Sequence, residues 1–226
     1  MNLVIPLPDG RIEMFGDCER KVAVFCAIDA YLKYDVEGRP DDPNIITMEQ
    51  IEAMNRAMQA RSPHGPWARL VGAPLRELVA IDASCDLIAM SDQEWHSVRL
   101  ALRDLYNRVI LQPHIGPASG TKVLHLMRPR LVAIADSVVI KWLGIPESDP
   151  ADRALAVAEA IRAIGRTDGN QAALADIQRY LGSLGFVSPV PSACRILDML
   201  LWMKAVSVPN GRRYDYLWQV MELLTP

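Results

Sequence analysis

The segment from Ile110 to Trp142 constrains the fold more than any other stretch of the chain. Pro113 ends an apolar helical run, Gly116 allows a tight turn, and a second short helix is expected to follow that turn. The sequence Arg128-Pro129-Arg130 ends the second helix, since proline cannot continue it. An apolar run then leads to Asp136, directly before another apolar helical run. We therefore expect Asp136 to cap a helix N-terminus, where a carboxylate keeps its negative charge easily.

This layout resembles the helix-hairpin-helix DNA glycosylase superfamily, which has the endonuclease III-like fold. The motif of that superfamily is Leu-Pro-Gly-Val-Gly, then a helix rich in Thr and Ala, then a hydrophobic lead into a catalytic Asp that opens a new helix. The residues that match it, with the expected interval between hairpin and acid, are Pro113, Ile115, Gly116, Thr121 and Asp136. His114 departs from the motif because it occupies the position of the first glycine, where a positive φ is expected.

The resemblance assigns the chemistry to Asp136. Cleavage of an N-glycosidic bond builds positive charge on the sugar, and a nearby carboxylate can stabilise that charge and orient the attacking water. The alternative is that Asp136 only caps a helix, which is a common role of aspartate. The interval between the hairpin and Asp136 favours catalysis.

A second departure from the motif concerns strand cleavage. In members that also cut the DNA strand, a lysine two residues after the second hairpin glycine forms a Schiff base; Ala118 occupies that position here. Lys122 lies one helical turn further on, and we expect its side chain to point elsewhere. The expected product is therefore an abasic site in an intact strand.

The hairpin itself is expected to bind the DNA backbone. Exposed N–H groups at a turn and a helix start bind phosphate without reading bases. The residues expected at this contact are Ile115, Gly116, Ala118, Lys122, Arg128 and Arg130. The alternative is a corner that only packs two helices. Hairpin carbonyls hold a monovalent cation in this superfamily, but His114 argues against that cation here, and we expect no other cofactor.

Base flipping requires a side chain that fills the gap in the duplex and a surface on which the base stacks. The candidates for this wedge or pocket are Arg61, His64, Trp67 and Arg195. Each has an ordinary alternative. Trp67 suits a core position, His64 suits the surface, and Arg195 can pair with Asp198 at an i, i+3 spacing.

The charge distribution matters more than the net charge of −3. Residues 1–60 hold eleven acids and six bases, whereas residues 120–145 hold four bases and the single acid Asp136. A basic face near the motif would supply phosphate contacts. A solvated surface of mixed charge is the alternative.

The four cysteines, Cys18, Cys26, Cys85 and Cys194, are scattered along the chain. This spacing argues against a zinc site or an iron–sulfur cluster, so we expect no metal and buried reduced thiols. No apolar stretch approaches the roughly 20 residues of a membrane span, and the N-terminus lacks the features of a signal peptide. A cytoplasmic monomer is expected.

These observations predict an all-α fold of two helical lobes, with a helix-hairpin-helix motif and a small N-terminal β-hairpin. Residues 46–131 form the lobe with the motif, residues 1–45 and 132–226 form the other, and the active cleft lies between them. The expected function is a monofunctional glycosylase that excises a damaged or modified base from double-stranded DNA, for DNA repair or for defence against modified foreign DNA. The alternatives are a non-catalytic DNA-binding module and a helical scaffold.

Overall fold

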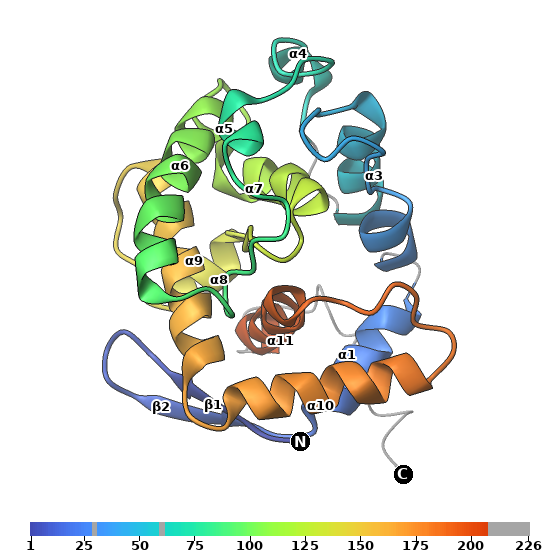
Figure 1. The fold of residues 1–226 in the computed structure, drawn as a ribbon, viewed down its shortest axis with the longest axis vertical. Coiled ribbons are helices and arrows are strands. Elements are labelled where there is room, and N and C mark those ends of the chain that lie inside the picture. Colours follow the sequence, from blue (N-terminus) through green and yellow to red (C-terminus); the bar gives the residue numbers. More distant parts are fainter. Residues whose placement is uncertain (29–30, 59–61, 208–226) are drawn as a thin grey trace.

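The fold is mostly helical, with one small antiparallel β-hairpin at the N-terminus (Figure 1). The structure, a computed structural model, describes residues 1–28, 31–58 and 62–207. The hairpin strands are β1 (Leu3–Pro6) and β2 (Ile12–Phe15). The helices of the first half are α1 (Cys18–Ala27), the π-helix η1 (Leu32–Val36), α3 (Met48–Met58), α4 (His64–Trp67), α5 (Arg76–Val79) and α6 (Asp92–Ile110). Those of the second half are α7 (Gly116–Met127), α8 (Ser137–Trp142), α9 (Pro150–Arg166), α10 (Asn170–Ser183) and α11 (Ala193–Ser207).

The N-terminal hairpin confirms the sequence prediction. Its register pairs Leu3 with Phe15 and Pro6 with Ile12 around a turn at residues 8–10. Asn170, at the start of α10, continues the hydrogen bonding of β1: its side chain accepts from the N–H of Val4 and donates to the carbonyl of the same residue. The side-chain amide of Asn170 therefore attaches the hairpin to the helical core, with hydrogen bonds like those that a third strand would make.

The apolar spacing from Asp17 to Tyr34 is that of one continuous helix, but the structure has two separate helices in this range. Helix α1 ends at Ala27, and the backbone of Ile28 is extended (φ −82°, ψ 147°). A separate π-helix follows from Leu32. Within it Asp35 is buried at 3% exposure, where it meets a partner that is remote in the sequence. Apolar spacing indicated the two helical pieces but carried no information about the break.

Capping residues that can be recognised in the sequence mark the starts of three further helices. Ser91 and Glu94 form a capping box at the start of α6, and Thr47 with Gln50 forms another before α3. Asp149 caps α9 through the N–H of Ala151. The residues of each cap are only two or three positions apart, which explains why the sequence alone locates these helix starts.

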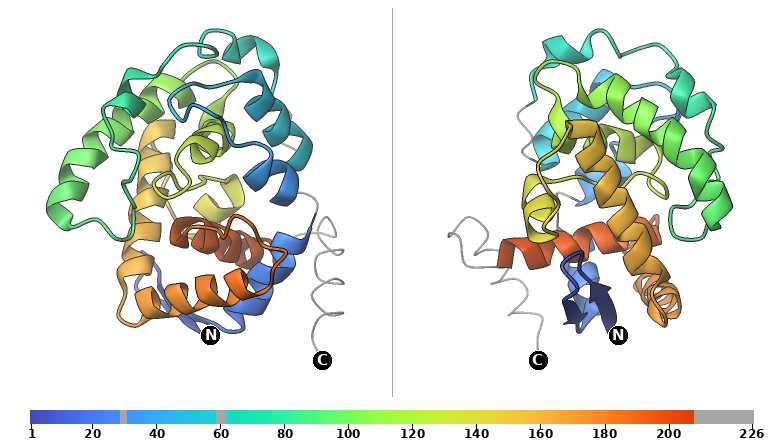
Figure 2. Two further views of the ribbon diagram at one scale, coloured as in Figure 1. Left: turned by 45° about the vertical axis from the view of Figure 1, so that its right-hand side comes forward. Right: turned by 90° about the vertical axis from the view of Figure 1, so that its left-hand side faces the viewer.

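Helix α7 lies at the centre of the fold, and its residues from Ser119 to Met127 are all buried. It packs against α3, α6 and α9, while α9 extends from α6 to the N-terminal hairpin (Figures 1 and 2). Buried apolar side chains from both predicted lobes belong to one continuous cluster. The division into lobes at residues 46–131 therefore stays a prediction.

A buried ion pair joins η1 to α11. The guanidinium of Arg195 donates two hydrogen bonds of 2.7 Å to the carboxylate of Asp35, and both side chains are at most 4% exposed. The guanidinium also lies over the rings of Tyr34 and Phe25, 5.3 and 5.6 Å from their centroids. Burial alone would lower the pKa of Arg195, but the Asp35 carboxylate outweighs it and raises this pKa. The expected pairing of Arg195 with Asp198 is thus replaced by a pairing with Asp35.

The replacement Asp35→Asn should destabilise the protein by about 3–5 kcal/mol, because it leaves a buried guanidinium without its counter-charge. Asp152, which pairs with Arg103 at the surface, provides the matched control. Asp152→Asn should change the stability much less, because solvent screens an exposed ion pair. Urea denaturation of both variants measures the difference. Equal effects would show that the buried pair adds no stability beyond that of a surface pair.

Candidate functional site

Two residues with positive φ form the connection between α6 and α7: one in the turn at residues 111–115 and one at the start of α7. His114 and Gly116 both have φ +66°. His114 thus adopts the left-handed conformation itself, although a non-glycine residue pays about 1–2 kcal/mol for it. Gly116 opens α7, and Pro117 follows in the first turn, where its missing N–H costs nothing. The conformation expected of a glycine at position 114 is therefore present without the glycine.

Close packing of α6 on α7 depends on Gly120. A Cβ at that position would lie 2.7 Å from Cγ1 of Ile110, which is nearer than carbon atoms approach. Ile115, the last residue of the turn, is buried, while Ala118 on the first turn of α7 is half-buried. The start of α7 is thus fixed against the end of α6.

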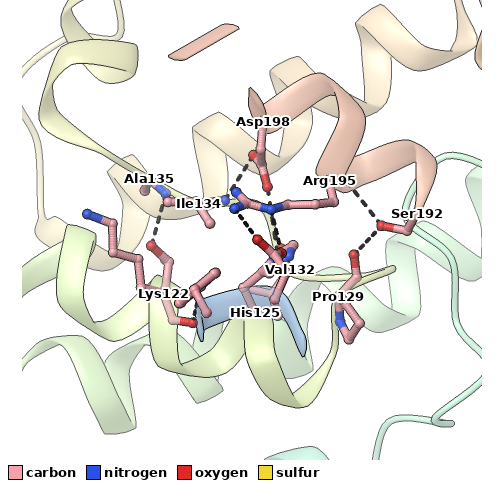
Figure 3. A network of polar contacts seen from close by, with 12 residues as sticks. Lys122, His125, Pro129, Val132, Ile134, Ala135, Ser192, Arg195 and Asp198 are labelled. Carbon is pink, nitrogen blue, oxygen red and sulfur yellow. Dashed lines mark hydrogen bonds and ion pairs between the residues drawn. The ribbon is translucent and has the colours of Figure 1, made fainter. Parts of the chain in front are cut away.

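Side chains from α7 and α11 hold the extended segment 131–136 between these helices (Figure 3). Thr121 accepts a 2.9 Å hydrogen bond from the N–H of Ala135 and donates one to the carbonyl of Pro117. Nδ1 of His125 lies 2.6 Å from the carbonyl oxygen of Val132. From α11, Asp198 accepts from the N–H of Ile134 at 3.1 Å. The segment ends at Asp136, whose position these contacts determine.

Asp136 is the N-cap of α8, as predicted, and it also forms an ion pair. Its Oδ1 accepts a hydrogen bond from the N–H of Val138, and its Oδ2 accepts one from Nζ of Lys122, both at 3.1 Å. The Lys122 side chain is 7% exposed and that of Asp136 is 19% exposed. The side chain of Lys122, which was expected to point elsewhere, is directed to Asp136, and its expected contact with a DNA phosphate stays a prediction. Lys122 is four residues beyond Ala118 on α7, and its ammonium is directed to Asp136.

Two ionisable side chains that hold this segment, His125 and Asp198, are neutral at physiological pH. Burial lowers the pKa of His125 to about 3, and the charge of Arg195 adds to this effect. Burial also raises the pKa of Asp198 to about 8, against the opposing influence of Arg195 and of the hydrogen bond from Ile134. The two side chains lie 3.6 Å apart. His125 therefore donates from Nδ1 to Val132 as a neutral ring, and the Asp198 carboxyl holds its proton.

Arg128 is a structural residue, so its predicted contact with DNA is wrong. Its guanidinium is buried and donates to the carbonyls of Pro43, Met127 and Leu78 and to the side chain of Asn44. Several acceptors from separate loops surround it, and no part of it can reach a phosphate. The residue joins the end of α7 to the loops around it.

Arg130 is exposed but lies in acidic surroundings. It pairs with Asp86 at 3.1 Å and lines a groove whose other charged residues are Asp82, Asp86 and Glu94. Of the four bases in residues 120–145, only Arg130 and Lys141 reach solvent. The predicted basic face is therefore not formed by this cluster, because Lys122 and Arg128 are directed inward.

The predicted wedge residues are not brought together. Trp67 is fully buried and donates from its indole nitrogen to Ser62, so it belongs to the core and cannot enter DNA. Arg195 is buried in its pair with Asp35 and likewise cannot serve as a wedge. His64 is exposed at the start of α4, and Arg61 lies outside the described residues.

The supporting residues that the sequence did not reveal are Asp35, His125 and Asp198. Each is a polar residue with an apolar or aromatic neighbour on both sides in the sequence, and that contrast is the signal that could have identified them. The prediction of buried thiols is confirmed for Cys18, Cys26 and Cys194, while Cys85 is half-buried. Within the described ranges, no group of three His, Cys, Asp or Glu side chains is arranged to hold a metal ion. None of the described helices is long and apolar enough to cross a membrane.

Comparison with known proteins identifies a family without an assigned activity. The model of a family of unknown function, DUF6308, matches residues 30–205. No curated protein and no solved structure is significantly similar to the chain. The matched range contains the α6–α7 turn, the extended segment and Asp136.

Opposite effects are expected at the two positive-φ residues of the turn. His114→Gly should stabilise the protein by up to about 1 kcal/mol, because the released strain exceeds the entropy that glycine adds to the unfolded chain. Gly116→Ala should destabilise it by about 1 kcal/mol or more, although no atom lies within 4 Å of the added Cβ. Gly65→Ala, in open space without a positive φ, is the control and should not destabilise. Thermal denaturation tests this pattern, and a destabilised His114→Gly would contradict it.

The buried carboxyl of Asp198 should make stability depend on pH. Its folded pKa of about 8 exceeds the unfolded value of about 4, so its contribution is complete below about pH 4 and is lost as the pH rises to about 8. Between pH 5 and pH 8 the wild type should therefore lose a few kcal/mol relative to Asp198→Asn. Asp176→Asn, at an exposed ion pair, is the control and should follow the wild type. Parallel pH profiles for wild type and Asp198→Asn would refute the assignment.

Proposed function

The chain belongs to DUF6308, a family of unknown function, and we propose that it is a monofunctional DNA glycosylase of the helix-hairpin-helix superfamily. In this proposal α6, the turn and α7 form the hairpin motif, and Asp136 is the catalytic carboxylate. The enzyme removes a damaged or modified base from double-stranded DNA and leaves an abasic site. It acts in repair, or in defence against modified foreign DNA.

One observation supports this proposal most: a partly exposed carboxylate is held in a fixed position at the expected interval after the turn. Asp136 accepts hydrogen bonds from two donors, and 19% of its side chain remains open to solvent. A helix cap alone requires only the bond from Val138. The extended segment before it is supported from both α7 and α11, so the carboxylate can be presented to a sugar without rearrangement.

The proposed reaction is hydrolysis. The bond between C1′ and the base nitrogen breaks, and its electron pair leaves with the base. The positive charge that develops on the sugar is stabilised by the Asp136 carboxylate. A water oxygen then bonds to C1′, and Asp136 orients this water and accepts its proton. The products are the free base and an abasic sugar in an intact strand.

The other parts of the proposal concern DNA binding. Helix α7 begins with N–H groups that have no intrahelical acceptor, and these can bind a backbone phosphate beside Gly116 and Ala118. Ala118 carries no amine, which agrees with a glycosylase that does not form a Schiff base at that position. The flipped base would enter between the two predicted lobes, residues 46–131 on one side and residues 1–45 with 132–226 on the other.

A second candidate function is a DNA-binding module without catalysis. The ion pair of Asp136 with Lys122 favours it, because a neighbouring ammonium weakens the attraction of a carboxylate for a sugar cation. In this candidate Asp136 and Lys122 would only join α7 to α8. The two functions make different predictions for base excision.

Asp136→Asn should remove base excision while the fold is kept. Loss of one group that stabilises charge in a transition state costs on the order of 10²–10³ in rate, whereas asparagine still caps the helix. The assay uses duplexes that carry a panel of modified bases, followed by hot alkali to cleave abasic sites. Asp149→Asn, which changes a cap at α9, is the matched control and should retain full excision. Undiminished excision by Asp136→Asn would exclude catalysis by this residue, and a wild type inert on all duplexes would favour the binding module.

A further inference from the structure

From the pairing of Lys122 with Asp136 we infer that Lys122 is a second catalytic residue, which stabilises and protonates the departing base. The inference rests on the proposed function and extends it to the substrate class. The site should act on uncharged bases, which leave the sugar as anions. It should act poorly on alkylated bases that already carry a positive charge.

The first support is the placement of the ammonium. Lys122 is 93% covered, since its side chain is only 7% exposed, and its Nζ lies 3.1 Å from Oδ2 of Asp136. The backbone beneath it is fixed, because the hydroxyl of Tyr34 donates a 2.6 Å hydrogen bond to the Lys122 carbonyl. Figure 3 shows the side chain extending away from Arg195 and Asp198. The Lys122 ammonium therefore lies beside the proposed catalytic carboxylate of Asp136 and apart from the ion pair of Arg195 with Asp35.

The second support is the incomplete hydrogen bonding of this ammonium. A lysine ammonium has three N–H donors. Within the described part of the chain, Asp136 is its one acceptor. Covering a charge while leaving donors unused costs free energy, and an apolar side chain would fill the same space without that cost. The carboxylate does not require it for position, because the N–H of Val138 already holds Oδ1. The unused donors are thus suited to an acceptor on a ligand.

The third support is the match between the pair and the charges that the reaction creates. When an uncharged base leaves, the sugar becomes positive and the base becomes negative. A carboxylate beside an ammonium is complementary to that separated pair, with Asp136 toward the sugar and Lys122 toward the base. A cationic base leaves as a neutral molecule, so the ammonium offers it nothing and repels it before departure. The ammonium of Lys122 therefore opposes the removal of cationic bases and favours the removal of uncharged ones.

Lys122 and Asp136 together supply and accept all the protons that the proposed reaction moves. The bond from C1′ to the base nitrogen breaks, and the electron pair on that nitrogen takes a proton from the Lys122 ammonium. Water bonds to C1′ through oxygen, and its proton passes to Asp136. That proton then crosses the 3.1 Å to Nζ of Lys122 and restores the starting state. The net reaction consumes one water and needs no oxidant, reductant or other co-reactant.

The test compares two kinds of duplex under single-turnover conditions. One set carries uncharged modified bases, namely uracil, hypoxanthine and 5-hydroxymethylcytosine, and the other carries the cationic base 7-methylguanine. Wild type should excise a base of the first set, and Lys122→Met should reduce that rate by 10²-fold or more. Excision of 7-methylguanine should be unchanged or faster in Lys122→Met. Lys122→Arg, which keeps the positive charge, should retain part of the activity, and Lys141→Met is the matched control at an exposed lysine of α8.

Several outcomes would overturn the inference. An equal loss on both kinds of duplex would show that Lys122 only supports the structure, and excision by wild type of 7-methylguanine alone would show the opposite selectivity. A covalent adduct trapped by borohydride would make Lys122 a nucleophile instead. If Lys122→Met does not fold, Lys122→Gln replaces it and should show the same loss of rate on the uncharged bases, with excision of 7-methylguanine kept. If wild type excises no base at all, the proposed function itself fails; if it excises an uncharged base and Lys122→Met does so equally well, only the inference fails.

Discussion

A buried stretch of backbone without regular secondary structure must have its polar groups satisfied by side chains, and segment 131–136 is such a stretch. It passes between α7 and α11, and residues 131–135 are all buried. Thr121 and His125 meet it from α7, and Asp198 meets it from α11. Because these contacts fix Val132, Ile134 and Ala135 against two helices, the carboxylate of the next residue, Asp136, has a defined position. The candidate site depends on this constraint.

The contacts that support segment 131–136 depend in turn on the buried ion pair of Arg195 with Asp35. Arg195 lies one turn before Asp198 on α11, and its bonds to Asp35 set where α11 sits relative to η1. Tyr34, next to Asp35, stacks on the ring of His125 with centroids 6.4 Å apart and also bonds to the Lys122 carbonyl. The residues that position Asp136 therefore come from three separate parts of the chain. The ammonium of Lys122 is therefore already in contact with the Asp136 carboxylate, and no loop has to close to bring the two together.

The local features of this structure could be predicted from the sequence, because each depends on neighbouring residues. The N-terminal hairpin, the capping boxes at Thr47 and Ser91, and the cap at Asp136 are of this kind. The partners of the buried charges could not be predicted. Asp35 and Arg195 are 160 residues apart, and Arg128 meets residues 84 and 85 positions away, so spacing along one helix carried no information about them. Lys122 was misplaced for a related reason: its distance from the expected lysine position was clear, but the direction of its side chain depended on where segment 131–136 runs.

The central claim is that Asp136 stabilises a positive charge on a deoxyribose, and it can be tested without knowing the base. The measurement is the affinity for two duplexes that differ at one abasic position, which is either a positively charged pyrrolidine or a neutral tetrahydrofuran. A charged mimic of the transition state should bind more tightly, on the order of 10²-fold or more, and Asp136→Asn should remove most of that preference. Equal affinity of the wild type for the two duplexes, or a preference that survives in Asp136→Asn, would contradict the account.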